Sequence, residues 1–168
     1  MSSFVYGIVS YLVFFVVFLY LIGFLGDLFV PKSIDSGTEA SAAQSVLVNL
    51  ALLGLFAVQH TIMARPAFKQ WWTEIVPKQV ERSTYVLVTS LLLALLFWQW
   101  HPMLGVVWSM DNTTGKAIFS VLFWLGWGTV LFSSFIINHF DLFGLRQVWV
   151  HYNNQKYQHL KFQVRSLY

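Results

Sequence analysis

Two histidines, His60 and His139, stand among the residues of this chain that are best suited to chemistry. Histidine titrates near pH 6.5, so either imidazole can accept a proton close to neutral pH. The polar residues near them in the predicted topology are Gln59, Arg65, Glu81, Arg82, Asn138, Asp141, Arg146 and Gln147. The sequence concentrates donors, acceptors and ionisable groups here, which predicts the functional site, although an interfacial histidine bound to water or backbone is a common alternative.

The same two histidines also fit a different class of protein. Axial histidines from facing helices can hold haem iron in a helical bundle, so a b-type haem membrane subunit is an alternative. The chain has no cysteine. Its absence excludes a thiolate metal site, a cysteine nucleophile, a disulfide framework and c-type haem attachment.

The elements that position these residues are long apolar segments. Of the 168 residues, 57% are hydrophobic and 10% are charged, whereas a soluble domain carries about 25% charged residues. The apolar blocks predict four membrane spans at about residues 4–29, 45–63, 84–100 and 116–138, followed by a tail at 139–168. Such blocks are long enough to cross a bilayer. We predict an all-α integral membrane bundle that forms one domain.

The distribution of basic residues predicts the orientation of this bundle. Residues 64–83 contain Arg65, Lys69, Lys78 and Arg82, and the tail contains Arg146, Lys156, Lys161 and Arg165. Basic residues favour the cytoplasmic side, and four crossings put both regions on one side. We therefore expect both termini and the tail to be cytoplasmic. The net charge is only +3 and no basic run suggests a nucleic-acid partner.

Aromatic and apolar residues recur at helical spacing inside the 64–83 segment. They are Phe68, Trp71, Trp72 and Ile75. This pattern is typical of a short helix lying in the membrane interface. A loop packed under the bundle fits the pattern equally well.

Several stretches resemble a known family. They are Gln59–Lys69 (QHTIMARPAFK), Val80–Leu87 (VERSTYVL), Phe97–Trp100 (FWQW) and Ile137–Val148 (INHFDLFGLRQV). Together, and in this order, they resemble the NnrU-type membrane proteins. The resemblance is greatest to the bacterial methanethiol S-methyltransferases, which are similar in turn to isoprenylcysteine carboxyl methyltransferases.

The resemblance implies an enzyme of the bacterial inner membrane that transfers a methyl group from S-adenosylmethionine to methanethiol, a small thiol, and forms dimethyl sulfide. For this chemistry we predict His60 or His139 as the base and Asp141 as the residue that orients a histidine. Arg146 would stabilise a thiolate or bind the cofactor carboxylate. Gln147 and Asn138 complete the predicted cofactor-binding set, and we expect no metal ion in the site.

The end of the sequence departs from the family pattern. In the family, an Arg-His-Pro motif, further hydrophobic helix and a late acidic residue lie beyond the region that this chain covers. These 168 residues contain no Arg-His-Pro. The chain thus looks like the N-terminal part of such an enzyme, and we expect it to fold in a membrane without binding the cofactor alone. A non-catalytic membrane assembly protein is the remaining alternative.

Overall fold

Four long helices dominate the protein, in a computed structural model that describes residues 1–38, 40–106 and 108–158. The four are long and apolar enough to cross a membrane: α1 (Ser2–Gly26), α2 (Ala42–Ala64), α4 (Glu81–Gln99) and α5 (Thr113–Ile137). Each of them overlaps one predicted span and differs from it by a few residues at the ends. The prediction of an all-α integral membrane protein with four spans is confirmed.

The ends of these helices follow from local residue chemistry. Asp27, which directly follows the last helical residue Gly26, takes a left-handed conformation with φ 51° and so ends α1. The Ser41 side chain accepts a hydrogen bond from the Gln44 backbone at the start of α2, and Asn112 accepts one from Gly115 at the start of α5. Serine and asparagine at these positions satisfy backbone N–H groups that the first helical turn leaves without partners.

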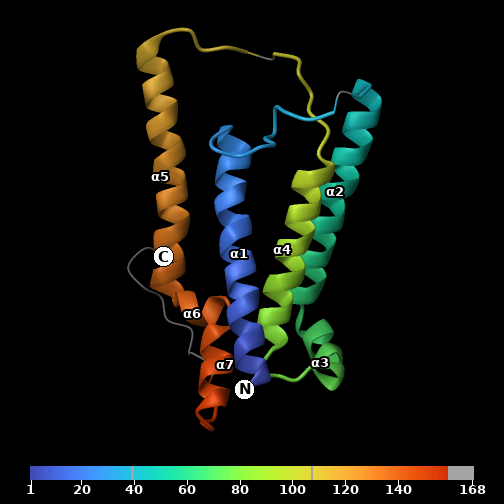
Figure 1. Cartoon of the computed structure of the whole chain (residues 1–168), viewed down its shortest axis with the longest axis vertical. Coiled ribbons are helices and arrows are strands. Elements are labelled where there is room, and N and C mark those ends of the chain that lie inside the picture. Colours follow the sequence, from blue (N-terminus) through green and yellow to red (C-terminus); the bar gives the residue numbers. More distant parts are fainter. Residues whose placement is uncertain (39, 107, 159–168) are drawn as a thin grey trace.

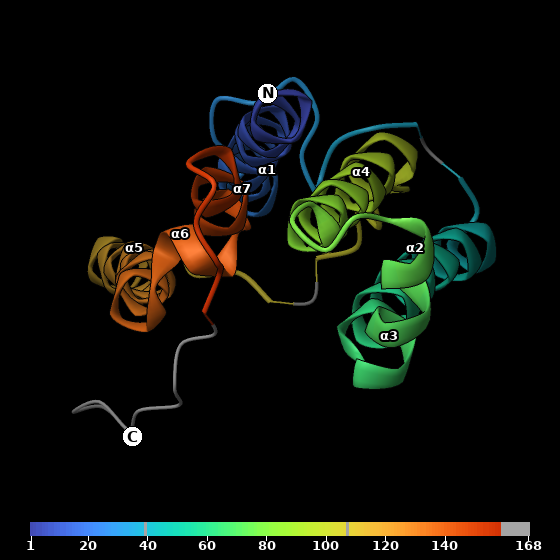
Figure 2. The same cartoon turned by 90° about the horizontal axis from the view of Figure 1, so that it is seen from below.

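The helix α1 lies beside α4, and α2 lies on the other side of α4 (Figures 1 and 2). Ser10 of α1 and Ser90 of α4 are buried, and each hydroxyl donates to a carbonyl of its own helix. Small residues of this kind let membrane helices approach closely. Further along, the Phe97 ring lies 4.8 Å from the Phe24 ring and stacks on Tyr20, which extends the same contact.

The fourth long helix, α5, stands apart from this group. Its most apolar stretch buries none of its residues inside the protein. It contacts α1 through the Trp127 ring, which meets the Phe18 ring edge-on at 5.4 Å. Lipid or further protein must therefore cover most of its apolar surface, because such a surface is unstable in water.

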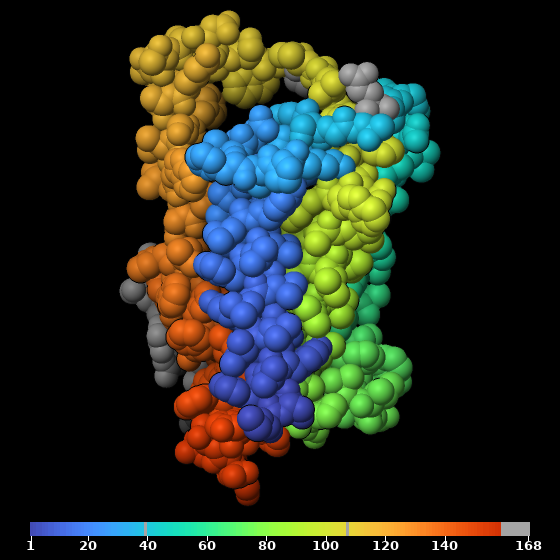
Figure 3. All heavy atoms as spheres, viewed as in Figure 1, coloured from blue at the N-terminus to red at the C-terminus, as the bar shows by residue number. Residues whose placement is uncertain are grey.

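One end of the bundle is covered by the loop that follows α1. In the space-filling view this light-blue segment lies across the top of the bundle (Figure 3). The Tyr20 hydroxyl donates to the Lys32 carbonyl, and the Trp100 indole N–H donates to the Ile34 carbonyl, each at 3.0 Å. The loop is thus fixed to both α1 and the end of α4.

Three short helices gather at the opposite end, together with the N-terminus (Figure 1). They are α3 (Pro66–Ile75), α6 (His139–Leu142) and α7 (Leu145–Tyr152). The helical reading of the 64–83 segment is therefore correct over α3, and its position in the interface stays a prediction. The predicted tail forms α6 and α7, and its residues 159–168 lie outside the described part.

The helix α7 is fixed to α1 by close packing. A Cβ atom on Gly7 would lie 2.6 Å from a methyl group of Val148, whose side chain is fully buried. The Phe4 ring also stacks on Tyr152 of α7 with 5.0 Å between centroids. These contacts hold the 138–147 segment, which carries most of the predicted site, against the first helix.

Candidate active site

The structure brings five of the six predicted site residues together and leaves one apart. Asn138, His139, Asp141, Arg146 and Gln147 all lie on α6, on α7 or at the start of α6. His60 lies on α2, which contacts α4 and α3. The candidate site is therefore centred on the turn between α5 and α7.

Asn138 makes this turn. It has φ 129°, outside the helical region, and ends α5. Its side-chain oxygen then accepts a hydrogen bond from the Asp141 backbone at 3.2 Å, which starts α6. With ψ 89° this conformation also lies outside the left-handed helical region in which asparagine is most often found at positive φ. In this structure Asn138 is thus a turn-forming residue, while its predicted contact with a cofactor stays a prediction.

Asp141 joins Arg146 and Tyr157 in a hydrogen-bonded cluster. Its carboxylate accepts from the Arg146 guanidinium at 3.2 Å and from the Tyr157 hydroxyl at 2.9 Å. The Arg146 guanidinium also lies 5.4 Å from the centre of the Tyr157 ring. Burial, and then the hydrogen bond to Asp141, raise the pKa of the Tyr157 phenol, so it remains a donor at neutral pH. The structure pairs Asp141 with Arg146 and Tyr157. The histidines, one of which Asp141 was expected to orient, are instead bonded to other residues.

Gln147 has one satisfied and one unsatisfied end. Its side-chain N–H donates to the Asp141 carbonyl at 3.1 Å. Its Oε1 atom is buried and has no hydrogen-bond partner within the described residues. A buried acceptor without a donor is unfavourable, so this oxygen suits a ligand that brings an N–H group. The neighbouring Arg146 side chain is 31% exposed and can be reached by a ligand.

His139 is enclosed by aromatic rings and two hydroxyl groups. It is only 6% exposed and stacks on Phe135 with 4.4 Å between centroids. The Tyr11 hydroxyl lies 2.8 Å from its Nε2, and the Ser134 hydroxyl lies 2.8 Å from its Nδ1. Because both nitrogens have protein partners, an axial bond from this ring to haem iron would require a partner to leave.

The burial of His139 predicts a pH dependence of stability. Burial lowers the pKa of the imidazole below its ordinary value, which is about 6.5 in the unfolded chain. Around the ring, Tyr11 of α1 and Ser134 of α5 are the polar partners, and the nearby carboxylate of Asp141 is held by Arg146. Below about pH 6.5 the unfolded chain binds a proton that the folded chain does not bind, so the free energy of unfolding decreases as the pH is lowered.

This fall can be measured as the midpoint of thermal unfolding in detergent. We expect the midpoint to be constant above about pH 6.5 and to decrease towards about pH 5. His139→Gln should reduce the decrease, because glutamine does not titrate in this range. An equal decrease in both proteins would assign the effect to other groups.

His60 is also paired with a tyrosine, but in a more open place. The Tyr85 hydroxyl lies 2.9 Å from its Nδ1, and the Phe56 ring stacks on it at 5.5 Å. Here the tyrosine is the buried partner and the imidazole is exposed. If His60 accepted a proton, its ring would do so on the outer surface of the bundle and not in an enclosed pocket.

Arg82 and an aromatic layer connect the two histidine positions. The Arg82 guanidinium lies over the Tyr85 ring at 5.4 Å, and its Nε–H donates to the Leu142 carbonyl at 2.8 Å. Phe143, which lies 4.8 Å from the His139 ring, stacks on Phe14 at 4.0 Å. Both phenylalanines pack against the cluster that contains Tyr85. His60 on α2 is thus linked to the His139 region only indirectly, through Tyr85 and Arg82 of α4 and the two phenylalanine rings.

Sequence reasoning missed the tyrosines of this region. Tyr11, Tyr85 and Tyr157 hold His139, His60 and Asp141 respectively. A signal was present for Tyr11 and Tyr85, because a tyrosine inside an apolar helix must find a partner for its hydroxyl. The sequence does not indicate which partner each hydroxyl has.

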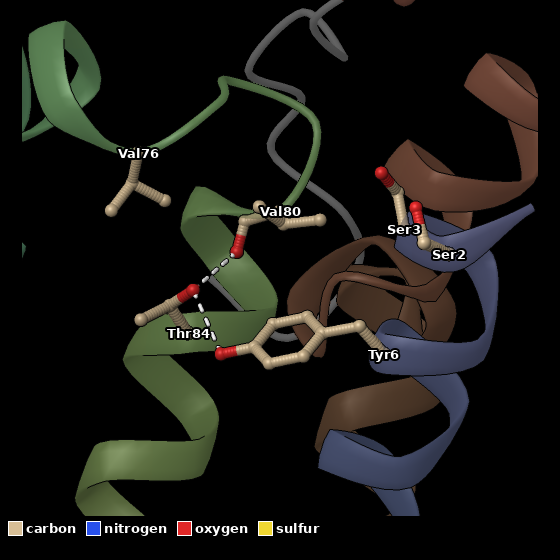
Figure 4. Close-up of a pocket in the computed structure, with 6 residues that line it drawn as sticks. All are labelled: Ser2, Ser3, Tyr6, Val76, Val80 and Thr84. Atoms are coloured by element: carbon tan, nitrogen blue, oxygen red, sulfur yellow. Dashed lines mark hydrogen bonds between the residues drawn. The ribbon is translucent and has the colours of Figure 1, made fainter.

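An open hollow lies at the same end of the bundle. Its volume is about 360 Å³, and it is lined by Ser2, Ser3, Tyr6, Val76, Val80 and Thr84. In Figure 4 the Tyr6 hydroxyl points at Thr84, to which it donates at 3.0 Å, and Thr84 donates to the Val80 carbonyl. The lining contains none of the six predicted site residues, and the hydroxyl groups of Tyr6 and Thr84 already bond to each other and to Val80.

The chain is similar in sequence to several bacterial enzymes. It is 53% identical to the methanethiol S-methyltransferase of Mycobacterium tuberculosis, over 98% of this chain and 67% of that protein. It is 50% identical to the methanethiol S-methyltransferase of Crocosphaera subtropica, over 97% of this chain and 64% of that protein. It is 51% identical to methanethiol S-methyltransferase 1 of Bradyrhizobium diazoefficiens, over 99% and 58%. No protein-family model matches the chain, and no solved structure matches it.

The four long apolar helices define an integral membrane protein. Similarity at this level over nearly the whole chain shows that it belongs to the methanethiol S-methyltransferase family, as the sequence resemblance implied. A methyltransferase requires a methyl donor. The chain spans between 58% and 67% of the length of these three relatives. The comparisons give no support to the haem-subunit or assembly-protein alternatives.

Proposed function

We propose that the protein transfers a methyl group from S-adenosylmethionine to methanethiol and releases dimethyl sulfide. One observation carries the proposal: three methanethiol S-methyltransferases match 97% or more of this chain at 50% identity or higher. The polar cluster on α6 and α7 supports it, because it combines proton acceptors with groups suited to a charged cofactor.

The cluster contains groups that fit the amino-acid end of the cofactor. S-Adenosylmethionine, when bound, supplies an electrophilic methyl group on a sulfonium. The Arg146 guanidinium has five N–H donors and gives one to Asp141 and one to the Gln158 carbonyl, so others remain for a carboxylate. We propose that Gln147 Oε1, which is buried and has no partner within the described residues, accepts from the ammonium group. In this proposal Asp141 and Tyr157 keep Arg146 in position, and Asn138 fixes the turn that carries them.

A base favours the reaction because the thiolate is the nucleophilic form of a thiol. His139 and His60 are the two proposed acceptors of the thiol proton. Burial keeps His139 neutral at pH 7, which leaves it able to accept a proton. We therefore propose His139 as the base, with His60 as the second candidate because its ring is accessible from outside.

The location of the cluster suits both proposed substrates. A charged cofactor arrives from the cytosol, whereas a small neutral thiol can also pass through the bilayer. We propose that the protein lies in the bacterial inner membrane with the ends of the bundle near α3, α6 and α7 on the cytoplasmic side. The basic residues of this end support that orientation.

The function is tested with the full-length protein, meaning this chain together with any sequence that follows residue 168 in its gene. Dimethyl sulfide is measured in the gas phase above membranes that contain this protein, methanethiol and S-adenosylmethionine. We expect formation that depends on both substrates. Arg146→Ala should raise the KM for the cofactor by about 10-fold or more, since it removes charge-assisted hydrogen bonds. Lys156→Ala, an exposed basic position nearby in sequence, is the matched control and should leave the KM unchanged. Absence of dimethyl sulfide, or a Soret band in the purified protein, would contradict the proposal.

The orientation is tested by labelling single cysteines, which this cysteine-free chain allows. Asp35→Cys and Asp111→Cys should react with an impermeant thiol reagent added outside the cell, and Lys78→Cys and Lys156→Cys should not. All four positions are exposed. Gly37 lies in the same loop as Asp35 but is a poorer position for cysteine, because its φ of +145° disfavours residues with a side chain. The reverse labelling pattern would place the site on the outer side of the membrane.

A further inference from the structure

The hydrogen bonds around His139 favour one position of the proton on its ring. The Ser134 hydroxyl donates to the Leu131 carbonyl at 2.7 Å. A hydroxyl has one proton to donate, so towards the His139 Nδ1 atom, 2.8 Å away, Ser134 can only accept. With Ser134 donating to Leu131, we assign the proton of the neutral ring to Nδ1.

The other nitrogen then has to be the acceptor. With Nδ1 protonated, Nε2 has a free lone pair, and the Tyr11 hydroxyl 2.8 Å away donates to it. The lone pair that would make His139 a base thus already faces Tyr11. The imidazole is 6% exposed, whereas Tyr11 is partly exposed. We infer that a proton from outside reaches Nε2 through the phenol oxygen.

We propose that Tyr11 is a further catalytic residue, which takes the proton of the thiol on its hydroxyl oxygen while it passes its own proton to His139. The inference rests on the proposed function and adds the residue that meets the acceptor substrate. It assigns His139 the role of the final proton acceptor behind Tyr11.

The proposed step balances as follows. The S–H bond of the thiol breaks and a new O–H bond forms on Tyr11, while the original Tyr11 O–H bond breaks and an Nε2–H bond forms on His139. The sulfur keeps the electron pair and forms a bond to the methyl carbon of the sulfonium cofactor, whose own C–S bond breaks. The proton leaves the imidazolium for solvent after product release, which returns His139 to its neutral form, while Tyr11 is neutral throughout.

The surroundings of His139 suit a transient positive charge. In the imidazolium, Nδ1–H still donates to Ser134 and Nε2–H donates to Tyr11, so both protons have acceptors. The Phe135 ring, stacked at 4.4 Å, presents its negative face to the ring. Because the two O–H bonds of Tyr11 exchange together, no full phenolate is needed.

The first test compares two tyrosines of α1 in the full-length protein. Tyr11→Phe should lower kcat by about 10²-fold or more, the usual contribution of a proton-transfer group, with the cofactor KM unchanged. Tyr6→Phe removes a hydroxyl that bonds Thr84 and should leave kcat unchanged. An active wild-type protein with an equally active Tyr11→Phe variant would overturn the relay alone. Absence of dimethyl sulfide formation by the wild type would overturn the proposed function and the relay together.

The second test needs no substrate and covers the case in which Tyr11→Phe folds poorly. Nitrogen-15 NMR of labelled histidine in the detergent-solubilised protein should show the His139 Nδ1 atom protonated and Nε2 as an acceptor. A proton on Nε2 would overturn the relay, since Tyr11 would then have no base to donate to.

The third test separates proton transfer from packing. Tyr11 faces the rings of Phe14, Phe15 and Phe143, and His139 is its titratable contact. Replacing Tyr11 with 3,5-difluorotyrosine keeps the shape and makes the phenol more acidic. The alkaline limb of the pH–kcat profile should move to lower pH, because an ionised phenol has no proton to pass on. An unmoved limb would show that Tyr11 only packs against His139.

Discussion

Replacing His139 with alanine is expected to lower the rate of dimethyl sulfide formation by about 10²-fold or more. The imidazole is the proposed proton acceptor, and its removal also takes away the ring nitrogen to which the Tyr11 hydroxyl is bonded. The measurement is kcat at saturating cofactor. We expect a smaller loss for His60→Ala, because the His60 ring is exposed and bonds a different tyrosine.

Two further proteins make this comparison specific. His151→Ala changes an exposed histidine on α7 and should behave like the wild type. Added imidazole should restore part of the activity of His139→Ala, since it can occupy the space of the missing ring. If His60→Ala were the inactive variant and His139→Ala retained its rate, the base would be His60.

Replacing Gly144 with alanine is expected to destabilise the protein by about 2–5 kcal/mol. Gly144 has φ +86°, and a Cβ atom there would lie 2.8 Å from the backbone nitrogen of Ser83. The left-handed conformation costs about 1–2 kcal/mol for a residue with a Cβ atom, and forced overpacking adds about 1–3 kcal/mol. The change would push α6 and α7 away from the start of α4, so activity should fall as well.

A second glycine serves as the control for this substitution. Gly128→Ala lies within α5, and an added Cβ atom there meets no other atom within 4 Å. Helix propensity favours alanine over glycine by about 1 kcal/mol, so this variant should be as stable as the wild type or slightly more stable. Unfolding midpoints in the same detergent compare the two. Equal midpoints for Gly144→Ala and Gly128→Ala would show that the α6–α4 contact does not limit stability.

Much of the fold could be predicted because it depends on local sequence. Long apolar blocks identify α1, α2, α4 and α5, and the aromatic spacing from Phe68 to Ile75 identifies α3. The grouping of Asn138, His139, Asp141, Arg146 and Gln147 was also predictable, since ten consecutive residues cannot be far apart. Helix ends were less accurate, because single capping residues such as Ser41 and Asn112 decide them.

The pairing within the site could not be predicted from the sequence. Tyr11 and His139 are 128 residues apart, and Arg82 and Leu142 are 60 apart. Such contacts depend on how α1, α4 and α6 pack, which no local pattern determines. Asp141 illustrates the difficulty: a carboxylate two residues from a histidine suggests that the two interact, yet the start of α7 brings Arg146 to it instead. The role of each predicted residue in catalysis stays a prediction.

The separation of Tyr11 from His139 has a consequence for biosynthesis. The ribosome completes α1 long before it reaches residue 139, so the Tyr11 hydroxyl enters the membrane before its histidine has been made. A hydroxyl without a partner in an apolar medium is unfavourable. Helices that insert first and associate afterwards therefore gain free energy when α6 reaches α1. The helix α1 acquires its hydrogen bond to His139 only after α5 has been inserted.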